Sequence, residues 1–168
     1  KTLIANRGEI AIRIAHAAAV LGIETVGVYH PVDAASLHTR AVSVAVELSG
    51  QTLQAGTPPL RSAALPSAAY LDAAQLVGVA LANGCDSVHP GYGFLSEDAD
   101  FARQCEAAGL AFIGPPADAI ELFGNKIHAR ALAVACGVPI VPGSGSGVAS
   151  GDEVAAFVAS DPAMGYPL

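Results

Sequence analysis

Short apolar runs alternate with amphipathic stretches along the first two thirds of the chain. The apolar runs predict strands at residues 1–5, 25–29, 42–48, 86–88 and 110–113. Between them, apolar residues at helical spacing predict helices at residues 9–21, 36–41, 72–82 and 96–108. The strands are continuously apolar, which is typical of a parallel sheet covered by helices on both faces. The pattern therefore predicts an α/β fold with a parallel sheet and flanking helices.

Two of these helices show clear boundary signals. In the helix predicted over 9–21, one face carries Ile10, Ile14, Ala17, Ala18 and Leu21. Gly22 follows as the residue that ends it. For the helix over 96–108, Ser96 is the predicted N-cap. Glu97 and Asp98 follow it, and their negative charges suit the positive end of the helix.

The pattern changes after residue 114, where a Gly-Pro-Pro triplet breaks the chain. Further helices are predicted over 118–123, 126–136 and 152–159, and a short extended piece over 138–141. Residues 49–69 and 142–151 are rich in Gly, Pro and Ser and are expected to be irregular. We therefore expect one domain over 1–114 and the beginning of a second over 115–168, which stops at an apolar segment as if cut from a longer chain.

Composition excludes several classes of protein. The 168 residues carry a net charge of −7 with only eight Lys and Arg, so no basic face for nucleic acid is expected. No uninterrupted apolar run is long enough to span a membrane, and no secretory signal is evident. Three cysteines without metal-ligand spacing favour a reduced, cytoplasmic protein. Cys85 and Cys136 are expected to be small core residues.

The segment HPGYGFLSED, residues 89–98, is the first candidate site. Gly91 and Gly93 suit a turn with positive φ or a close approach of backbone to a ligand. The segment follows a predicted strand, so Tyr92 should lie at the carboxyl edge of the sheet, where α/β proteins bind ligands. A dinucleotide-binding module is disfavoured, because the first turn has Gly8 alone and Glu9 would repel a phosphate.

Lys126 is the second candidate. The chain has two lysines, and this one opens a predicted helix, where a cation opposes the helix dipole. A phosphate bound nearby would make a positive charge favourable at this position, which suggests a phosphate-binding role. The alternative is an ordinary surface lysine in contact with water. The five histidines show no metal-ligand spacing, and His89 is expected to be an oriented hydrogen-bonding residue.

Five segments follow one another along the chain: IANRGEIAIRI, HPGYGFLSED, FIGP, GNK and GVPIVPGS. In this order they resemble the amino-terminal region of biotin carboxylase, an ATP-grasp enzyme. The resemblance covers nearly the whole chain. It implies a Rossmann-like pre-ATP-grasp domain over 1–114 followed by the start of the ATP-grasp domain. It also implies ATP-dependent carboxylation of biotin by bicarbonate through carboxyphosphate, in a protein that works with a biotin carrier domain and a carboxyltransferase domain or subunit.

The same resemblance implies roles for particular residues. Lys126 would contact the ATP phosphates, and Tyr92, Gly91 and Gly93 would form a loop facing biotin. No catalytic residue or metal ligand is expected in this segment, since the Mg²⁺ ligands of the family lie beyond it. Alone, it should neither hydrolyse ATP nor carboxylate biotin.

Some positions depart from the family pattern. Asn125 stands where the family has Asp, and residues 49–69 are longer than usual. The resemblance implies a homo-oligomeric parent, but His16 and Val20 replace charges that form the usual dimer. Two other readings stay open: a different ATP-grasp ligase, such as one like carbamoyl-phosphate synthase, and a non-catalytic α/β interaction module.

Overall fold

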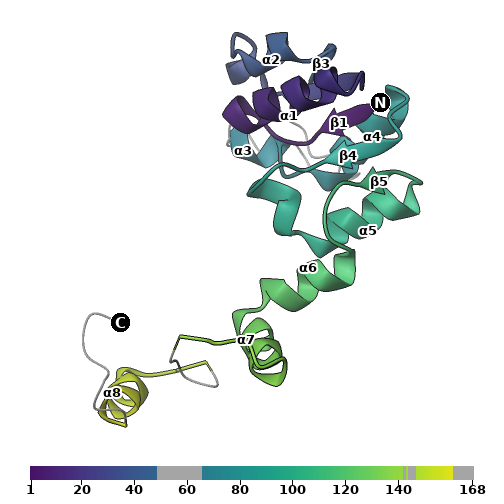
Figure 1. Ribbon diagram of the computed structural model, residues 1–168. Coiled ribbons are helices and arrows are strands. Elements are labelled where there is room, and N and C mark those ends of the chain that lie inside the picture. The colour runs from purple at the N-terminus through teal and green to yellow at the C-terminus, as the bar shows by residue number, and fades with distance from the viewer. Residues whose placement is uncertain (49–65, 142, 144–146, 161–168) are drawn as a thin grey trace, which may run out of the picture. The chain divides into compact units, whose positions relative to one another are not determined.

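The computed structural model describes residues 1–48, 66–141, 143 and 147–160 (Figure 1). The chain forms two compact units, Lys1–Glu121 and Leu122–Leu168. Each unit is described by itself below.

The first unit is built on a five-stranded sheet with the order β3-β2-β1-β4-β5. Its strands are β1 (Thr2–Ile4), β2 (Thr25–Tyr29), β3 (Val44–Glu47), β4 (Ser87–His89) and β5 (Ala111–Phe112). Every neighbouring pair is parallel. The predicted parallel α/β fold is confirmed, and each strand lies where an apolar run predicted one.

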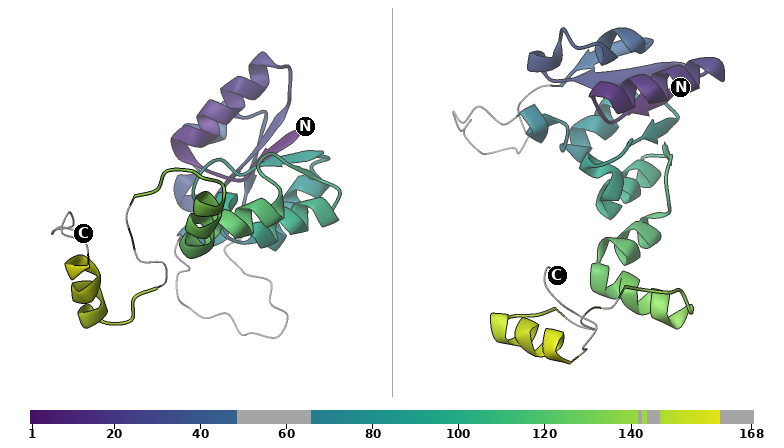
Figure 2. Two further views of the ribbon diagram at one scale, coloured as in Figure 1. Left: turned by 60° about the horizontal axis from the view of Figure 1, so that its bottom comes forward. Right: turned by 60° about the vertical axis from the view of Figure 1, so that its left-hand side comes forward.

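Helices cover both faces of this sheet (Figures 1 and 2). On one face lie α1 (Gly8–Val20) and α2 (His38–Ala41), and on the other α4 (Ala73–Ala82) and α5 (Ala99–Ala107). The unit also contains α3 (Pro66–Ala69) and the 3₁₀ turns η1 (Pro31–Asp33) and η2 (Phe94–Glu97). The helix α6 (Ala117–Gly124) begins in this unit, where it packs on α5. Alternate residues of β1 divide the core, because successive strand side chains point to opposite faces. Ile4 packs with α1, whereas Leu3 packs with residues of α4 and α5.

The buried face of α1 differs in part from the predicted one. Ile14 and Ala18 are buried as expected, and Ala11 and Ala15 join them. The prediction was wrong for Ala17 and Leu21, which are exposed. The buried residues 11, 14, 15 and 18 are spaced as i, i+3, i+4 and i+7, so they form one stripe along the helix, and positions 17 and 21 lie outside it. Leu21 is the C-cap, beyond the last turn, and Gly22 has the expected positive φ of 69°.

Three further expectations need correction. Ser96 does not cap the helix: it lies in η2, and the Asp98 side chain caps α5 by accepting from the Phe101 N–H. Irregular structure was predicted over 49–69, but Pro66–Ala69 is the helix α3, and residues 49–65 lie outside the described ones. Cys136 is exposed, whereas Cys85 is buried as predicted.

The second unit contains α7 (Lys126–Ala135) and α8 (Gly151–Ala159), close to the predicted helices. The Asn125 side chain caps α7 by accepting from the N–H groups of Ile127 and His128. The Arg130 side chain donates to the carbonyl oxygens of Val141 at 2.7 Å and Gly143 at 3.2 Å. These bonds hold the segment after α7 against the helix.

Candidate functional site at the carboxyl edge of the sheet

The order of the strands makes the carboxyl edge between β1 and β4 the candidate ligand site. The chain runs from β1 to β2 and β3 on one side and returns to β4 and β5 on the other. Crevices at such a reversal, outside the carboxyl ends of the strands, are where open α/β sheets bind ligands. The Ala5 N–H donates to the His89 carbonyl oxygen at 2.9 Å, so the segments leaving β1 and β4 start side by side.

The glycine loop after β4 takes a conformation that few residues other than glycine adopt. Gly91 and Gly93 have φ values of 70° and 61°, and Phe94 has a φ of 45° despite its side chain. The Gly91 N–H donates to Nδ1 of His89 at 3.1 Å, as expected of an oriented histidine. Burial lowers the pKa of His89, which favours the neutral ring that can accept this bond. Tyr92, between the glycines, is 64% exposed.

Asn6 connects the glycine loop to the end of β1. Its Nδ2 donates to the carbonyl oxygens of Pro90 at 2.8 Å and Tyr92 at 2.9 Å, and its Oδ1 accepts from the Arg7 N–H. The residue is only 2% exposed. A Cβ on Gly91 would lie 2.7 Å from Asn6 Nδ2, so the glycine is needed for this close approach. The sequence analysis did not single out Asn6, because the loop that it binds lies 84 and 86 residues away in the chain.

Arg7 opens a second set of contacts at the same edge. Its Nε donates to Asp33 Oδ2 at 2.7 Å and its Nη2 to Asp33 Oδ1. The Tyr70 hydroxyl donates to Asp33 Oδ2 at 2.7 Å and accepts from the His30 N–H. The hydrogen bonds from Arg7, and then that from Tyr70, hold the pKa of Asp33 at about 2. Burial raises the pKa of Tyr70 to about 12, so its hydroxyl remains a donor.

Two aromatic contacts extend this network to the glycine loop. The Tyr70 ring lies 5.8 Å from the Phe94 ring, between centroids, and the Arg7 guanidinium lies 5.7 Å from the Tyr70 ring. Ring pairs at this spacing contribute about 1 kcal/mol beyond the area they bury. Phe94 is thus held at the far end of the loop from Asn6.

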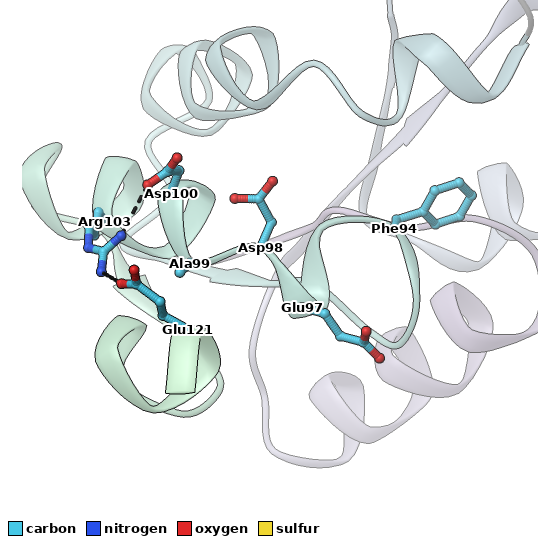
Figure 3. Close-up of a pocket in the computed structure, with 7 residues that line it drawn as sticks. All are labelled: Phe94, Glu97, Asp98, Ala99, Asp100, Arg103 and Glu121. Carbon is cyan, nitrogen blue, oxygen red and sulfur yellow. Dashed lines mark hydrogen bonds and ion pairs between the residues drawn. The ribbon is translucent and has the colours of Figure 1, made fainter. Parts of the chain in front are cut away.

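The cleft shown in Figure 3 lies beside this loop and is strongly acidic. Carboxylates of Glu97, Asp98, Asp100 and Glu121 line it. Arg103, its one lining cation, forms ion pairs with Asp100 and Glu121, and the Glu121 hydrogen bond chiefly raises the Arg103 pKa. Its carboxylates outnumber its cation, so the cleft does not suit a phosphate or another anion.

Lys126 lies in the second unit, separate from Tyr92 in the first. It is the first residue of α7, directly after the Asn125 cap, and it is exposed. Among the residues that the structure describes, none forms an ion pair with it. The ammonium group therefore stands at the positive end of a helix without a compensating charge there, which suits an anionic ligand.

Other candidate chemistry is sparse within the described ranges. No group of three or more His, Cys, Asp or Glu side chains there could hold a metal ion. Burial raises the pKa of the Cys105 thiol to about 11, which disfavours a reactive thiolate. None of the described helices is long and apolar enough to cross a membrane.

The strand reversal and the glycine loop define a doubly wound α/β domain with a candidate ligand site at its carboxyl edge. The family model for the N-terminal domain of biotin carboxylase matches residues 1–120. The chain therefore belongs to the biotin carboxylase N-terminal domain family.

Individual relatives agree with this assignment. The chain is 44% identical to mouse (Mus musculus) mitochondrial pyruvate carboxylase over 168 residues, which are all of the chain and 13% of that enzyme. It is 49% identical over 143 residues to the rice (Oryza sativa subsp. japonica) mitochondrial methylcrotonoyl-CoA carboxylase subunit alpha, covering 85% of the chain and 18% of the subunit.

A solved structure is also similar. The biotin carboxylase domain of Hydrogenobacter thermophilus 2-oxoglutarate carboxylase, in complex with MgADP, ADP and bicarbonate, superimposes with a TM-score of 0.82 at 36% identity. The match covers 99% of this chain and 33% of that one. The chain thus spans a third or less of each of these three proteins.

Proposed function

We propose that this chain acts as the N-terminal part of a biotin carboxylase, within a longer protein that carboxylates biotin with ATP and bicarbonate. The observation that carries the proposal is the exposed Tyr92, held between two positive-φ glycines at the strand reversal. Membership of the biotin carboxylase N-terminal domain family supports it.

The relatives also support a role in the half-reaction that they share. Their names refer to different acceptors, namely pyruvate, methylcrotonoyl-CoA and 2-oxoglutarate, yet they match this chain at 36–49% identity. A segment that chose the acceptor would be expected to differ with it. We therefore assign the segment to carboxylation of biotin, before transfer to any acceptor.

The glycine loop fits the biotin side of this reaction. Gly91 and Gly93 leave the backbone uncovered by side chains, so those of its polar groups that Asn6, His89 and Ser96 do not engage could reach the ureido ring of biotin. Tyr92 supplies an exposed aromatic face and a hydroxyl. The loop would bind and orient biotin, which in the parent protein is attached to a carrier domain.

Lys126 fits the nucleotide side. Its exposed ammonium group and the α7 N-terminus both favour negative charge, and ATP would supply it with its phosphates. Mg²⁺ would be held by residues beyond this segment. Because Asn125 caps α7 through its Oδ1, as an aspartate would, the departure from the family pattern leaves the start of the helix intact.

The remaining assignments concern the parent protein. We propose a pre-ATP-grasp domain over 1–114 and the start of the ATP-grasp domain over 115–168. The parent would work in the cytoplasm with a biotin carrier and a carboxyltransferase domain or subunit. It would be a homo-oligomer, and Val20, which is 87% exposed on α1, offers apolar surface for such contacts.

The test is direct carboxylation of biotin by the purified full-length protein. With free biotin, ¹⁴C-bicarbonate and MgATP, we expect label in acid-labile carboxybiotin, and no label without ATP. If ATP is cleaved at the same rate without biotin, and no ¹⁴C enters biotin, the protein is instead a different ATP-grasp ligase.

A further inference from the structure

We propose that Asn6 is a positioning residue for Tyr92, which it holds outward by binding the backbone on both sides of Gly91. This inference rests on the proposed function, since it concerns how the loop is made ready for biotin. Asn6 itself is buried and lies below the loop, so it acts through the tyrosine and not on the ligand.

The geometry of the Asn6 amide carries the argument. Its single NH₂ group has two hydrogens, and it donates one to the Pro90 carbonyl and the other to the Tyr92 carbonyl. These carbonyls belong to the peptide groups that precede Gly91 and Gly93. With both oxygens turned inward to Asn6, the two peptide planes are fixed, and the Tyr92 side chain between them is left pointing to solvent.

A second brace fixes the end of the loop. Phe94 keeps a positive φ of 45°, a conformation that costs about 1 kcal/mol or more in a residue with a large side chain. Its ring packs on Tyr70, whose hydroxyl is tied to Asp33. The loop is thus held at both ends by the segments that follow β1 and β2, which leaves Tyr92 as its exposed part.

The identity of residue 6 matters because the loop offers only acceptors to it. Asparagine meets two carbonyl oxygens with two donor hydrogens. An aspartate of the same size would place carboxylate oxygens against them, with no hydrogen to share. Asn6→Asp therefore removes the two bonds without creating a cavity, and it separates hydrogen bonding from packing.

The experiment compares Asn6→Asp with Asn83→Asp in the full-length protein. Asn83 is a matched control, because its Nδ2 also donates to a backbone carbonyl, that of Val79, at 2.8 Å, but at the end of α4 away from the loop. We expect Asn6→Asp to raise the KM for free biotin about tenfold or more and to leave the KM for ATP within twofold. Asn83→Asp should change neither constant.

Hydrogen exchange provides a readout that does not depend on activity. The backbone amides of residues 91–94 should exchange at least tenfold faster in Asn6→Asp, while those of α4 and α5 keep the wild-type rate. If Asn6→Asp does not fold, Asn6→Ser, which keeps one donor, should give a smaller change of the same kind. Unchanged exchange in the loop would overturn the proposal.

A double-mutant cycle with Tyr92→Ala tests whether Asn6 acts through the tyrosine. On that background Asn6→Asp should raise the biotin KM no further. Additive effects, or equal rises in the biotin and ATP KM values, would overturn the positioning role. If Tyr92→Ala alone leaves the biotin KM unchanged, the assignment of the loop to biotin fails, and this inference with it, even where exchange shows a loosened loop.

Discussion

Asp33 is expected to make the stability of the first unit depend on pH in the acid range. Asp33 is 5% exposed, and its carboxylate is bound by Arg7 and Tyr70, which hold its pKa at about 2, against 3.8 for an ordinary aspartate. Since the folded pKa lies below the unfolded one, Asp33 contributes its full stabilisation only well above pH 3.8. This stabilisation is lost as the pH falls towards 2.

The size of the effect follows from these two pKa values. Relative to neutral pH, proton linkage predicts a loss from Asp33 of about 1 kcal/mol at pH 3 and about 2 kcal/mol at pH 2. Asp33→Asn removes this titration. The difference in unfolding free energy between wild type and Asp33→Asn should therefore narrow by about 1 kcal/mol between pH 6 and pH 3.

Urea unfolding followed by circular dichroism at 222 nm measures this difference at each pH. Ile4→Val is the control, because shortening this fully buried side chain should lower the free energy of unfolding by about 1 kcal/mol without removing a titratable group. Its difference from wild type should stay constant with pH. If the Asp33→Asn difference also stays constant or widens, Asp33 does not carry the depressed pKa that the contacts imply.

Three further outcomes are expected. Gly91→Ala should lower the unfolding free energy by about 2 kcal/mol in the urea assay, because residue 91 has a positive φ and the new methyl group would clash with the buried Asn6 amide. The control Gly78→Ala adds a methyl group in open space on α4 and should be neutral or stabilising, so equal effects of the two substitutions would contradict this reasoning. Tyr70→Phe should lower the free energy of unfolding by about 2 kcal/mol, because it removes a buried hydroxyl with two hydrogen-bond partners. Tyr92→Phe should lower it by less than about 0.5 kcal/mol, because the Tyr92 side chain is exposed; equal losses would show that the hydrogen bonds of the Tyr70 hydroxyl stabilise the fold little. Purified residues 1–168 should show no ATP cleavage or biotin carboxylation, and turnover would mean that this segment holds the catalytic groups.

The fold could be predicted from the sequence because its signals are local. The two central strands β1 and β2 are short apolar runs that are buried almost throughout, as continuous apolarity predicts. The signal is weaker for β4, which has a single apolar residue, and for the edge strand β3, which is apolar but largely exposed. The first and last residues of the helices were less predictable. Ser96 has the chemistry of a helix cap, but the positive φ of Phe94 sends the chain first into a 3₁₀ turn, and Asp98 becomes the cap instead.

The local geometry of the candidate site was predictable only where its residues stand together in the chain. The glycine loop is contiguous, so its turn chemistry could be read directly. Asn6 and Asp33 gave no such signal, because the loop carbonyls bound by Asn6 lie 84 and 86 residues away, and Asp33 is 26 residues from Arg7 and 37 from Tyr70. Only the parallel pairing of β1 with β4 brings Asn6 to the loop.

The most direct test of the account is a comparison of Tyr92→Ala and Lys126→Ala in the full-length protein, with initial rates measured as biotin and ATP are varied separately. Tyr92→Ala should raise the biotin KM about tenfold or more and leave the ATP KM within twofold, and Lys126→Ala should do the reverse. Lys1→Ala, which changes the only other lysine of the segment, should alter neither. If each variant changes both constants alike, or neither, the division of this segment into a biotin-facing loop and a phosphate-binding lysine is wrong.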